Sequence, residues 1–336
     1  MKISHRWRSR KIRFAGFSLI ELMISLTIGL IISIAAMSAY LGSSTASKAA
    51  AAQSRMDEDG QAALKLLSQQ IRLAGSNPVQ SGRTVDYRRN PVYATAYQGG
   101  ASSPYTTTLP TFTPTSYALS QFAIRGCDGT FTNIATATTL DGLSCPGTAT
   151  ASPDSIAISY EADIYDTVKT STGAATDCVG GGISSVTASG ALVATFAVAD
   201  NRFYIANSTT GIPNLYCKGI TNATAQPLIE NIEDMQIRYG SVSATATLST
   251  DPIAGYRDAV DIEPTGTTLS AAAAAWGRIL TVRICVVMRS ADPVLTDAGS
   301  GSEQYYKCDG TLDTSKTDLR LRRAYSTTIA LRNRKT

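Results

Sequence analysis

Histidine is almost absent from the sequence: His5 is the only one among 336 residues. The rest of the chain therefore has no imidazole for a Ser-His-Asp or Cys-His nucleophile, and none for a zinc site. Six cysteines are present, but no two have the C-x-x-C spacing of a zinc or redox site. We also find no glycine-rich phosphate loop and no nucleophile elbow. These absences predict a chain that is not an enzyme and holds no cofactor and no metal.

The excess of basic over acidic residues is confined to one short segment at the N-terminus. The net charge of +4 depends on six bases within residues 1–15, where there is no acid: Lys2, Arg6, Arg8, Arg10, Lys11 and Arg13. Without residues 1–16 the chain has 24 bases and 26 acids, a net charge of −2. A nearly neutral remainder argues against nucleic acid as a partner.

Charged side chains are missing from the next 25 residues, Phe17 to Leu41, except for Glu21. As a helix this stretch would be about 37 Å long at ~1.5 Å per residue, enough to cross a hydrocarbon core of ~30 Å. It is too long for the apolar core of a secretory signal peptide, roughly 7–15 residues. The bases before it, against only Lys48 and Arg55 soon after it, predict a cytoplasmic N-terminus and an external head.

Glu21 is the exception within the apolar stretch. A carboxylate there costs several kcal/mol unless it finds a partner, and such residues mark function more often than not. The alternative is a glutamate near the membrane end whose carboxylate extends to the interface.

A resemblance to type IV prepilins is carried by six residues that follow the basic residues 1–15, namely Gly16-Phe17-Ser18-Leu19-Ile20-Glu21. The resemblance implies cleavage by a prepilin peptidase after Gly16 and N-methylation of the new N-terminal Phe17. It also implies that Glu21 pairs with the N-terminal ammonium of a neighbouring subunit, a strong attraction within ~4–6 Å in a lipid-like medium. Major pilins usually carry a proline in this segment, and here none occurs between Phe17 and Asn77. A more continuous helix fits a subunit used in few copies.

Residues 43–74 continue the helical pattern in more polar sequence. Apolar residues recur there at the 3–4 spacing of an amphipathic helix: Met56, Ala63, Leu64, Leu67, Ile71 and Ala74. Gly75 followed by Ser76-Asn77-Pro78 is a stop signal. We predict a leader over residues 1–16, one helix over 17–75 that is transmembrane over about 17–41, and a β-rich head over 76–336.

The head contains a polar surface loop at Gly99–Ser116 and a series of short strand patterns. The expected strands are Ala118–Arg125, Ser155–Tyr160, Ala191–Val198, Phe203–Ala206, Leu228–Tyr239, Arg278–Met288 and Ala324–Leu331. One face of the sixth strand should hold Leu280, Val282, Ile284, Val286 and Met288. A helix followed by strands predicts an α+β fold, which the prepilin resemblance makes pilin-like: one long N-terminal helix packed on an antiparallel β-sheet head.

A second resemblance, to the PilW type of minor pilin, is carried by three segments of the head. They are Pro227–Gly240 (PLIENIEDMQIRYG), Trp276–Arg289 (WGRILTVRICVVMR) and Leu321–Arg334 (LRRAYSTTIALRNR). With the leader they cover about a fifth of the chain, and the middle, roughly 80–225, carries no resemblance. The charged residues of these segments have ordinary interpretations: Glu230, Glu233 and Asp234 suit a solvated edge, and Arg332 and Arg334 a polar terminus. Asp309, Asp313 and Asp318 lack the spacing of a calcium loop.

The six cysteines allow fifteen pairings in an oxidising compartment. Neighbours along the chain suggest three disulfides: Cys127 with Cys145, Cys178 with Cys217, and Cys285 with Cys308. Each would contribute roughly 3 kcal/mol in the chain-entropy model. The alternative is that Cys285 is a buried free thiol.

The two resemblances imply a minor pilin: a structural subunit that helps initiate type IV pilus assembly and enters the fibre near its tip. The chain would be held in the inner membrane by a single span, with its head in the periplasm, before it joins the fibre at the cell surface. Implied partners are the prepilin peptidase, other minor pilins, the major pilin and a PilY-type tip adhesin.

Two rival functions remain at this point. A J-type minor pseudopilin of type II secretion shares the leader and architecture, although the closing ALRNR segment favours the pilus. A membrane-anchored protein that binds DNA or glycans would need Arg88-Arg89 and Arg320, Arg322 and Arg323 to form one patch.

Overall fold

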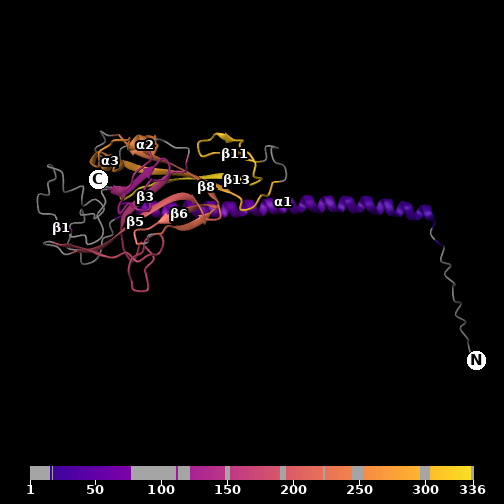
Figure 1. Cartoon of the computed structure of the whole chain (residues 1–336), viewed down its shortest axis with the longest axis horizontal. Helices are drawn as coiled ribbons and strands as arrows, with labels where there is room; N and C mark the ends of the chain where they lie inside the picture. Colours follow the sequence, from indigo (N-terminus) through magenta and orange to yellow (C-terminus); the bar gives the residue numbers. More distant parts are fainter. Residues whose placement is uncertain are drawn as a thin grey trace, which may run out of the picture. The chain divides into compact units, whose positions relative to one another are not determined.

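The computed structural model describes residues 16, 18–76, 111–112, 122–147, 152–189, 194–221, 224–243, 253–295 and 303–333. The chain divides into two compact units, Met1–Ala51 and Ala52–Thr336. Helix α1 (Leu19–Leu73) supplies residues to both units, and all described elements after it belong to the second (Figure 1).

Helix α1 is continuous over 55 residues, as a proline-free sequence permits. It ends two residues before the predicted boundary. Gly75 then adopts a left-handed backbone with φ of 70°, which glycine reaches without strain, and its N–H donates to the Ser159 carbonyl at 2.9 Å. The stop signal therefore turns the chain directly onto a strand of the head.

Within the second unit, α1 buries one stripe of side chains at the 3–4 spacing. The stripe consists of Met56, Gly60, Ala63, Leu67 and Ile71. Leu64, expected in this stripe, is only half-buried. Gly60 was not expected there, because its lack of a side chain hides it from an apolar pattern.

Two β-sheets make up most of the second unit. The larger has the path β1-β4-β5-β3-β2, with β6 paired to β5 and β7 to β6. Its strands are β1 (Thr111–Phe112), β2 (Ile124–Cys127), β3 (Ser155–Ala162), β4 (Val186–Ser189), β5 (Ala194–Asn207), β6 (Pro213–Lys218) and β7 (Gln226–Glu230). The smaller has the order β13-β10-β8-β9, formed by β8 (Ile232–Val242), β9 (Ile253–Arg257), β10 (Ile279–Arg289) and β13 (Arg322–Ala330). All of the pairs are antiparallel.

Short elements complete the unit. A hairpin pairs β11 (Tyr305–Tyr306) with β12 (Leu312–Asp313), and the helices are η2 (Leu140–Gly142), α2 (Ala259–Ile262) and α3 (Leu269–Trp276). One hydrophobic core joins α1, both large sheets, α2 and α3. The α+β prediction is confirmed, with the long helix packed on antiparallel sheet.

The strand predictions were wrong in two places. The expected strand Leu228–Tyr239 is two strands, because Asn231 has a positive φ of 62° that no continuous strand tolerates. The expected strands Ala191–Val198 and Phe203–Ala206 are one 14-residue strand, β5. Of the expected strand Ala118–Arg125, residues 118–121 lie outside the described residues, as does most of the Gly99–Ser116 loop.

Strand β10 has the predicted buried face, with one exception. Val282, Ile284 and Val286 are fully buried, but Leu280 is only half-buried while its neighbour Ile279 is buried. A register shift between Ile279 and Thr281 against β8 explains this, because a bulge reverses the alternation of side chains.

Candidate functional site

Ser18 caps the N-terminus of α1. Its hydroxyl accepts a hydrogen bond from the Glu21 N–H at 3.2 Å, and its carbonyl accepts one from the Leu22 N–H at 3.2 Å. Ser-x-x-Glu is the pattern of a helix cap, a signal that lies inside the prepilin motif and that the sequence interpretation did not use. The cap fixes where the helix begins relative to Gly16.

The predicted processing site lies beside this cap. Gly16 is exposed, and a Cβ placed on it would meet no atom within 4 Å. Phe17 lies outside the described residues. Any requirement for glycine at position 16 therefore comes from a protein that binds this segment, since the fold itself leaves space for a side chain.

Glu21 lies in the first turn of α1, among exposed apolar side chains. Leu19 is 80% exposed and Ile20 is 68% exposed. A carboxylate in the first turn is favoured by the partial positive charge of the helix N-terminus. When a membrane or another protein covers the apolar side chains around it, this carboxylate is removed from water as well.

The apolar surface of the first unit continues well beyond Glu21. Among the described residues, α1 is the one helix that is apolar and long enough to cross a membrane, and its most apolar part is wholly exposed. Its hydroxyl groups are satisfied within the helix: Thr27 donates to the Ile24 carbonyl at 2.8 Å and Ser33 donates to the Gly29 carbonyl at 2.8 Å. A membrane can therefore accept these side chains without an unpaired donor.

The three PilW-like segments come together in the smaller sheet. They form the adjacent strands β8, β10 and β13, with Ile284 of β10 opposite Ile237 on one side and Thr327 on the other. The segments are far apart in the sequence, so no local pattern could have placed them side by side.

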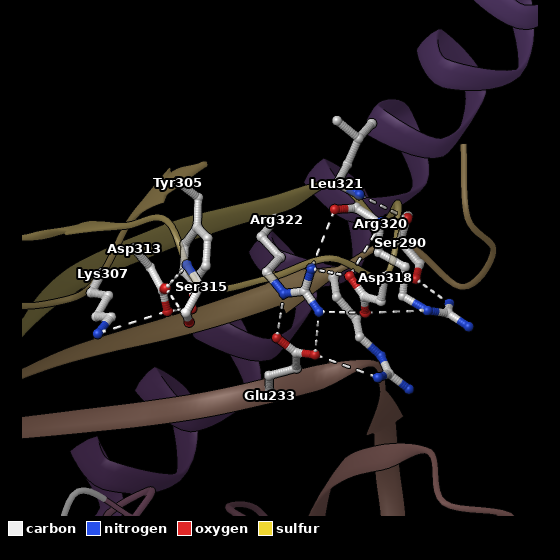
Figure 2. Close-up of polar contacts among 11 residues, drawn as sticks. Glu233, Ser290, Tyr305, Lys307, Asp313, Ser315, Asp318, Arg320, Leu321 and Arg322 are labelled. Carbon is white, nitrogen blue, oxygen red and sulfur yellow. Dashed lines mark hydrogen bonds and ion pairs between the residues drawn. The ribbon is translucent and has the colours of Figure 1, made fainter. Parts of the chain in front are cut away.

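Glu233 is the centre of a charged network at one end of this sheet (Figure 2). Its carboxylate accepts two hydrogen bonds from the Arg322 guanidinium, at 2.7 and 2.9 Å, and lies 3.4 Å from Nη1 of Arg289. Arg322 also donates twice to Asp318, at 2.6 Å each, and these bonds lower the pKa of Asp318 to about 2. Only 2% of the Arg322 side chain is exposed.

The expectation that Glu233 and Asp234 lie on a solvated edge was wrong. Glu233 joins strands β8, β10 and β13 through its two arginines, with its side chain 17% exposed. Burial raises the pKa of Asp234. Glu230 alone of the three is exposed, on the neighbouring strand β7.

The arginines proposed as a DNA-binding patch have other contacts. Arg322 is paired with Glu233, Arg323 contacts Asp57 of α1 at 3.1 Å, and Arg320 donates to the Ser290 carbonyl at 2.7 Å. Arg88 and Arg89 lie outside the described residues. The three C-terminal arginines are thus engaged in holding the sheet and helix together.

Trp276, the last residue of α3, is buried in the core three residues before β10 begins. Its ring packs edge-to-face on Tyr239, with centroids 4.8 Å apart, and its indole N–H donates to Glu263 at 2.7 Å. The Glu263 carboxylate also accepts a hydrogen bond from the Arg125 guanidinium. Arg125 also donates a hydrogen bond to the Leu140 carbonyl at 2.7 Å. A cavity of about 190 Å³ is lined in part by Arg125 and Glu263, whose side chains already bond each other. Neither Arg125 nor Glu263 was singled out from the sequence.

Three disulfides join Cys127 to Cys145, Cys178 to Cys217, and Cys285 to Cys308. These are the pairs that chain neighbours suggest, and no cysteine is free. The third disulfide ties the β11–β12 hairpin to β10. Among the described residues, no group of three or more His, Cys, Asp or Glu side chains could hold a metal ion.

Two family models match the chain. The model described as type IV pilus-assembly protein W matches residues 202–333, which include β8, β10 and β13. The model of the prokaryotic N-terminal methylation motif matches residues 12–37, which include Gly16 and Glu21.

The resemblance to PilW-type pilins is confirmed. Among solved structures, a type IV-like pilin from Thermus thermophilus is similar to the chain, with 10% identity over 55% of this chain and 82% of that chain. Its TM-score of 0.25 is too low to bear on fold or function. No curated protein matches.

The matches support a type IV pilus-related pilin that resembles the PilW type. Pilins of this kind are structural proteins. The leader motif and the apolar part of α1 indicate membrane anchoring and incorporation into a pilus, and association with other pilins and with a prepilin peptidase.

Proposed function

We propose that this PilW-type pilin is a minor pilin: a structural subunit without enzymatic activity that helps to start pilus assembly and stays in the fibre near its tip. The observation that carries the proposal is Glu21, a carboxylate in the first turn of α1, surrounded by exposed apolar side chains. Glu21 lies five residues after Gly16, which is exposed and at which an added Cβ would meet no atom within 4 Å.

The mechanism begins with cleavage after Gly16, which gives Phe17 a free ammonium group that is then N-methylated. Ser18 caps the helix one residue later, so the ammonium and the helix N-terminus place positive charge at the same point. Glu21 lies four residues beyond Phe17, about 6 Å along the helix axis. A neighbouring subunit's ammonium can meet Glu21 only if the two helices are offset along their axes, so the pair sets the stagger.

The head would take part as a rigid, oxidised body. Three disulfides and the Glu233 network brace it, and its sheet is fixed to α1 through Asp57. Partners for the head would be other minor pilins, the major pilin and a PilY-type tip adhesin. Before assembly the chain would lie in the inner membrane with its N-terminus in the cytoplasm and its head in the periplasm.

The test is Glu21→Ala in the full chain. Insertion should be unaffected, because an uncharged residue is better tolerated in an apolar span. The variant should still be cleaved after Gly16 and fractionate with the inner membrane, but it should be depleted from sheared pili. Glu58→Ala, which removes an exposed carboxylate from the same helix beyond the apolar stretch, is the matched control and should enter fibres normally.

If Glu21→Ala enters fibres as well as the parent, the carboxylate merely reaches the interface and the charge-pair mechanism is wrong. If deleting the chain leaves pili intact and abolishes type II secretion, the J-type pseudopilin is the correct assignment.

A further inference from the structure

The edges of the two large sheets differ in how they are protected against pairing with another strand. In the larger sheet, edge strands β1 and β2 have two and four residues, and edge strand β7 contains Pro227 and Glu230. In the smaller sheet, edge strand β9 has five residues, ends in Arg257 and is bulged against β8. Shortness, proline, charge and bulges are the usual means of blocking edge-to-edge association.

Strand β13, at the other edge of the smaller sheet, has none of these protections over most of its length. It has nine residues in unbroken register with β10. From Ala324 to Leu331 the sequence AYSTTIAL has no charge, no proline and no glycine. Such a segment is rich in β-branched and aromatic residues and readily accepts a further strand.

The backbone geometry shows which groups of β13 are available. The hydrogen bonds at the two ends of the ladder, from Ser290 N–H to the Leu321 carbonyl and from Leu331 N–H to the Leu280 carbonyl, place odd-numbered residues toward β10. In an antiparallel pair the alternate residues then direct their N–H and C=O away from the partner. These residues are Ala324, Ser326, Thr328 and Ala330, and the side chains of the last three are exposed.

Hydrogen bonds also join β13 and the residues after it to α1, the helix that contains Glu21. Tyr325 donates to Asp57 of α1 at 2.5 Å, Arg323 contacts the same carboxylate, and Asn333 donates to the Arg72 carbonyl at 2.8 Å. Arg323, before the uncharged stretch, is already paired with Asp57, whereas Arg332, after it, is exposed. An incoming strand would therefore be neutral in its middle and acidic at the end that lies beside Arg332.

We propose that the outer edge of β13, Ala324–Ala330, is an interaction surface that takes an edge strand from the head of a different pilin subunit, so that one sheet runs through two heads. This inference rests on the proposed function, since it names the surface by which one pilin head joins another. The added strand would be held by main-chain hydrogen bonds to the four outward residues and by an acidic side chain on Arg332.

The experiment uses the full chain, co-expressed with the other pilin subunits of its system and purified with them from membranes. Ser326→Pro removes one outward N–H and no bond to β10, so the fold should persist while strand addition is blocked. Ser326→Ala keeps that N–H and is the matched control. Thr328→Lys, a charge on the exposed edge, is a second and independent block.

We expect Ser326→Pro and Thr328→Lys to recover at least about tenfold less of the other pilin subunits than the parent, with membrane level and disulfides unchanged. Ser326→Ala should match the parent. Hydrogen exchange gives a second measurement: the amides of Ser326, Thr328 and Ala330 should exchange at least about tenfold more slowly in the complex than in the chain alone. The amides of Thr327 and Ile329, bonded to β10, should be slow in both.

Equal recovery of partners by Ser326→Pro and the parent, or unchanged exchange at the three outward amides, overturns the inference. Protection that appears when the chain is purified without other pilins also overturns it, because the occupant is then a second copy of this chain. The Glu21→Ala result is independent: if Glu21→Ala is depleted from pili while Ser326→Pro is not, the proposed function stands and the edge surface does not.

Discussion

Gly60→Ala provides a sharp test of how α1 packs against the head. In an ordinary helix this change stabilises a protein by about 1 kcal/mol, because alanine has the higher helix propensity. Here a Cβ on Gly60 would lie 2.8, 2.9 and 3.0 Å from three ring carbons of Tyr325. The ring cannot easily move away, since its hydroxyl donates to Asp57 at 2.5 Å and β13 is paired along its whole length.

The two effects have opposite signs, and their magnitudes decide the result. Overpacking of this kind costs about 1–3 kcal/mol, so the free energy of unfolding should fall by roughly 1 kcal/mol net instead of rising. The assay is urea denaturation of the oxidised unit Ala52–Thr336, followed by circular dichroism. In a Tyr325→Ala background, which removes the ring, Gly60→Ala should stabilise by about 1 kcal/mol. If Gly60→Ala stabilises the parent as it would any helix, the ring does not lie against the helix and this contact is wrong.

Three further predictions concern the same unit. Glu233→Gln should lower the free energy of unfolding by about 2–4 kcal/mol, because buried Arg322 loses the more buried of its two carboxylate partners. Exposed Glu230→Gln should stay within about 0.5 kcal/mol. Burial raises the pKa of Asp154 to about 7, so its contribution to stability is full below about pH 4 and is lost as the pH rises through 7. Stability of the parent should therefore fall relative to Asp154→Asn between pH 4 and 8, and parallel pH curves would contradict the burial of this carboxyl. Under denaturing, non-reducing conditions the oxidised unit should show no reactive thiol, and two or more would contradict the disulfide pairs.

Local patterns were sufficient for the long helix. The apolar run, the 3–4 stripe and the Gly75 stop are all short-range signals, and α1 ends within two residues of the predicted boundary. Alternation of side chains also located β10 and its buried face. These features depend on neighbours in sequence, which is why sequence alone could predict them.

Features that depend on distant partners could not be predicted in this way. Glu233 resembles a surface acid until Arg322, 89 residues later, lies beside it. Trp276 and Glu263 acquire their roles from Tyr239 of β8 and Arg125 of β2, which are distant in the sequence. The break between the two strands at Asn231 was missed because the alternation of apolar and polar side chains does not reveal that an asparagine has a positive φ.

The exposed surface of α1 explains why so much of the proposed function depends on one carboxylate. Fourteen large apolar side chains between Leu19 and Leu41 are more than half exposed. At ~1.5–3 kcal/mol for each one fully buried, they represent roughly 20 kcal/mol or more, beyond the ~5–15 kcal/mol by which a domain is folded. They must therefore be covered, but lipid and the helices of other pilins cover them about equally well, so apolar contact does not favour one over the other. Glu21 does distinguish them, because its charge is unfavourable in lipid and favourable beside an ammonium. In the proposed function, the apolar segment therefore holds the chain in the membrane, and the carboxylate favours its transfer from the membrane to the fibre.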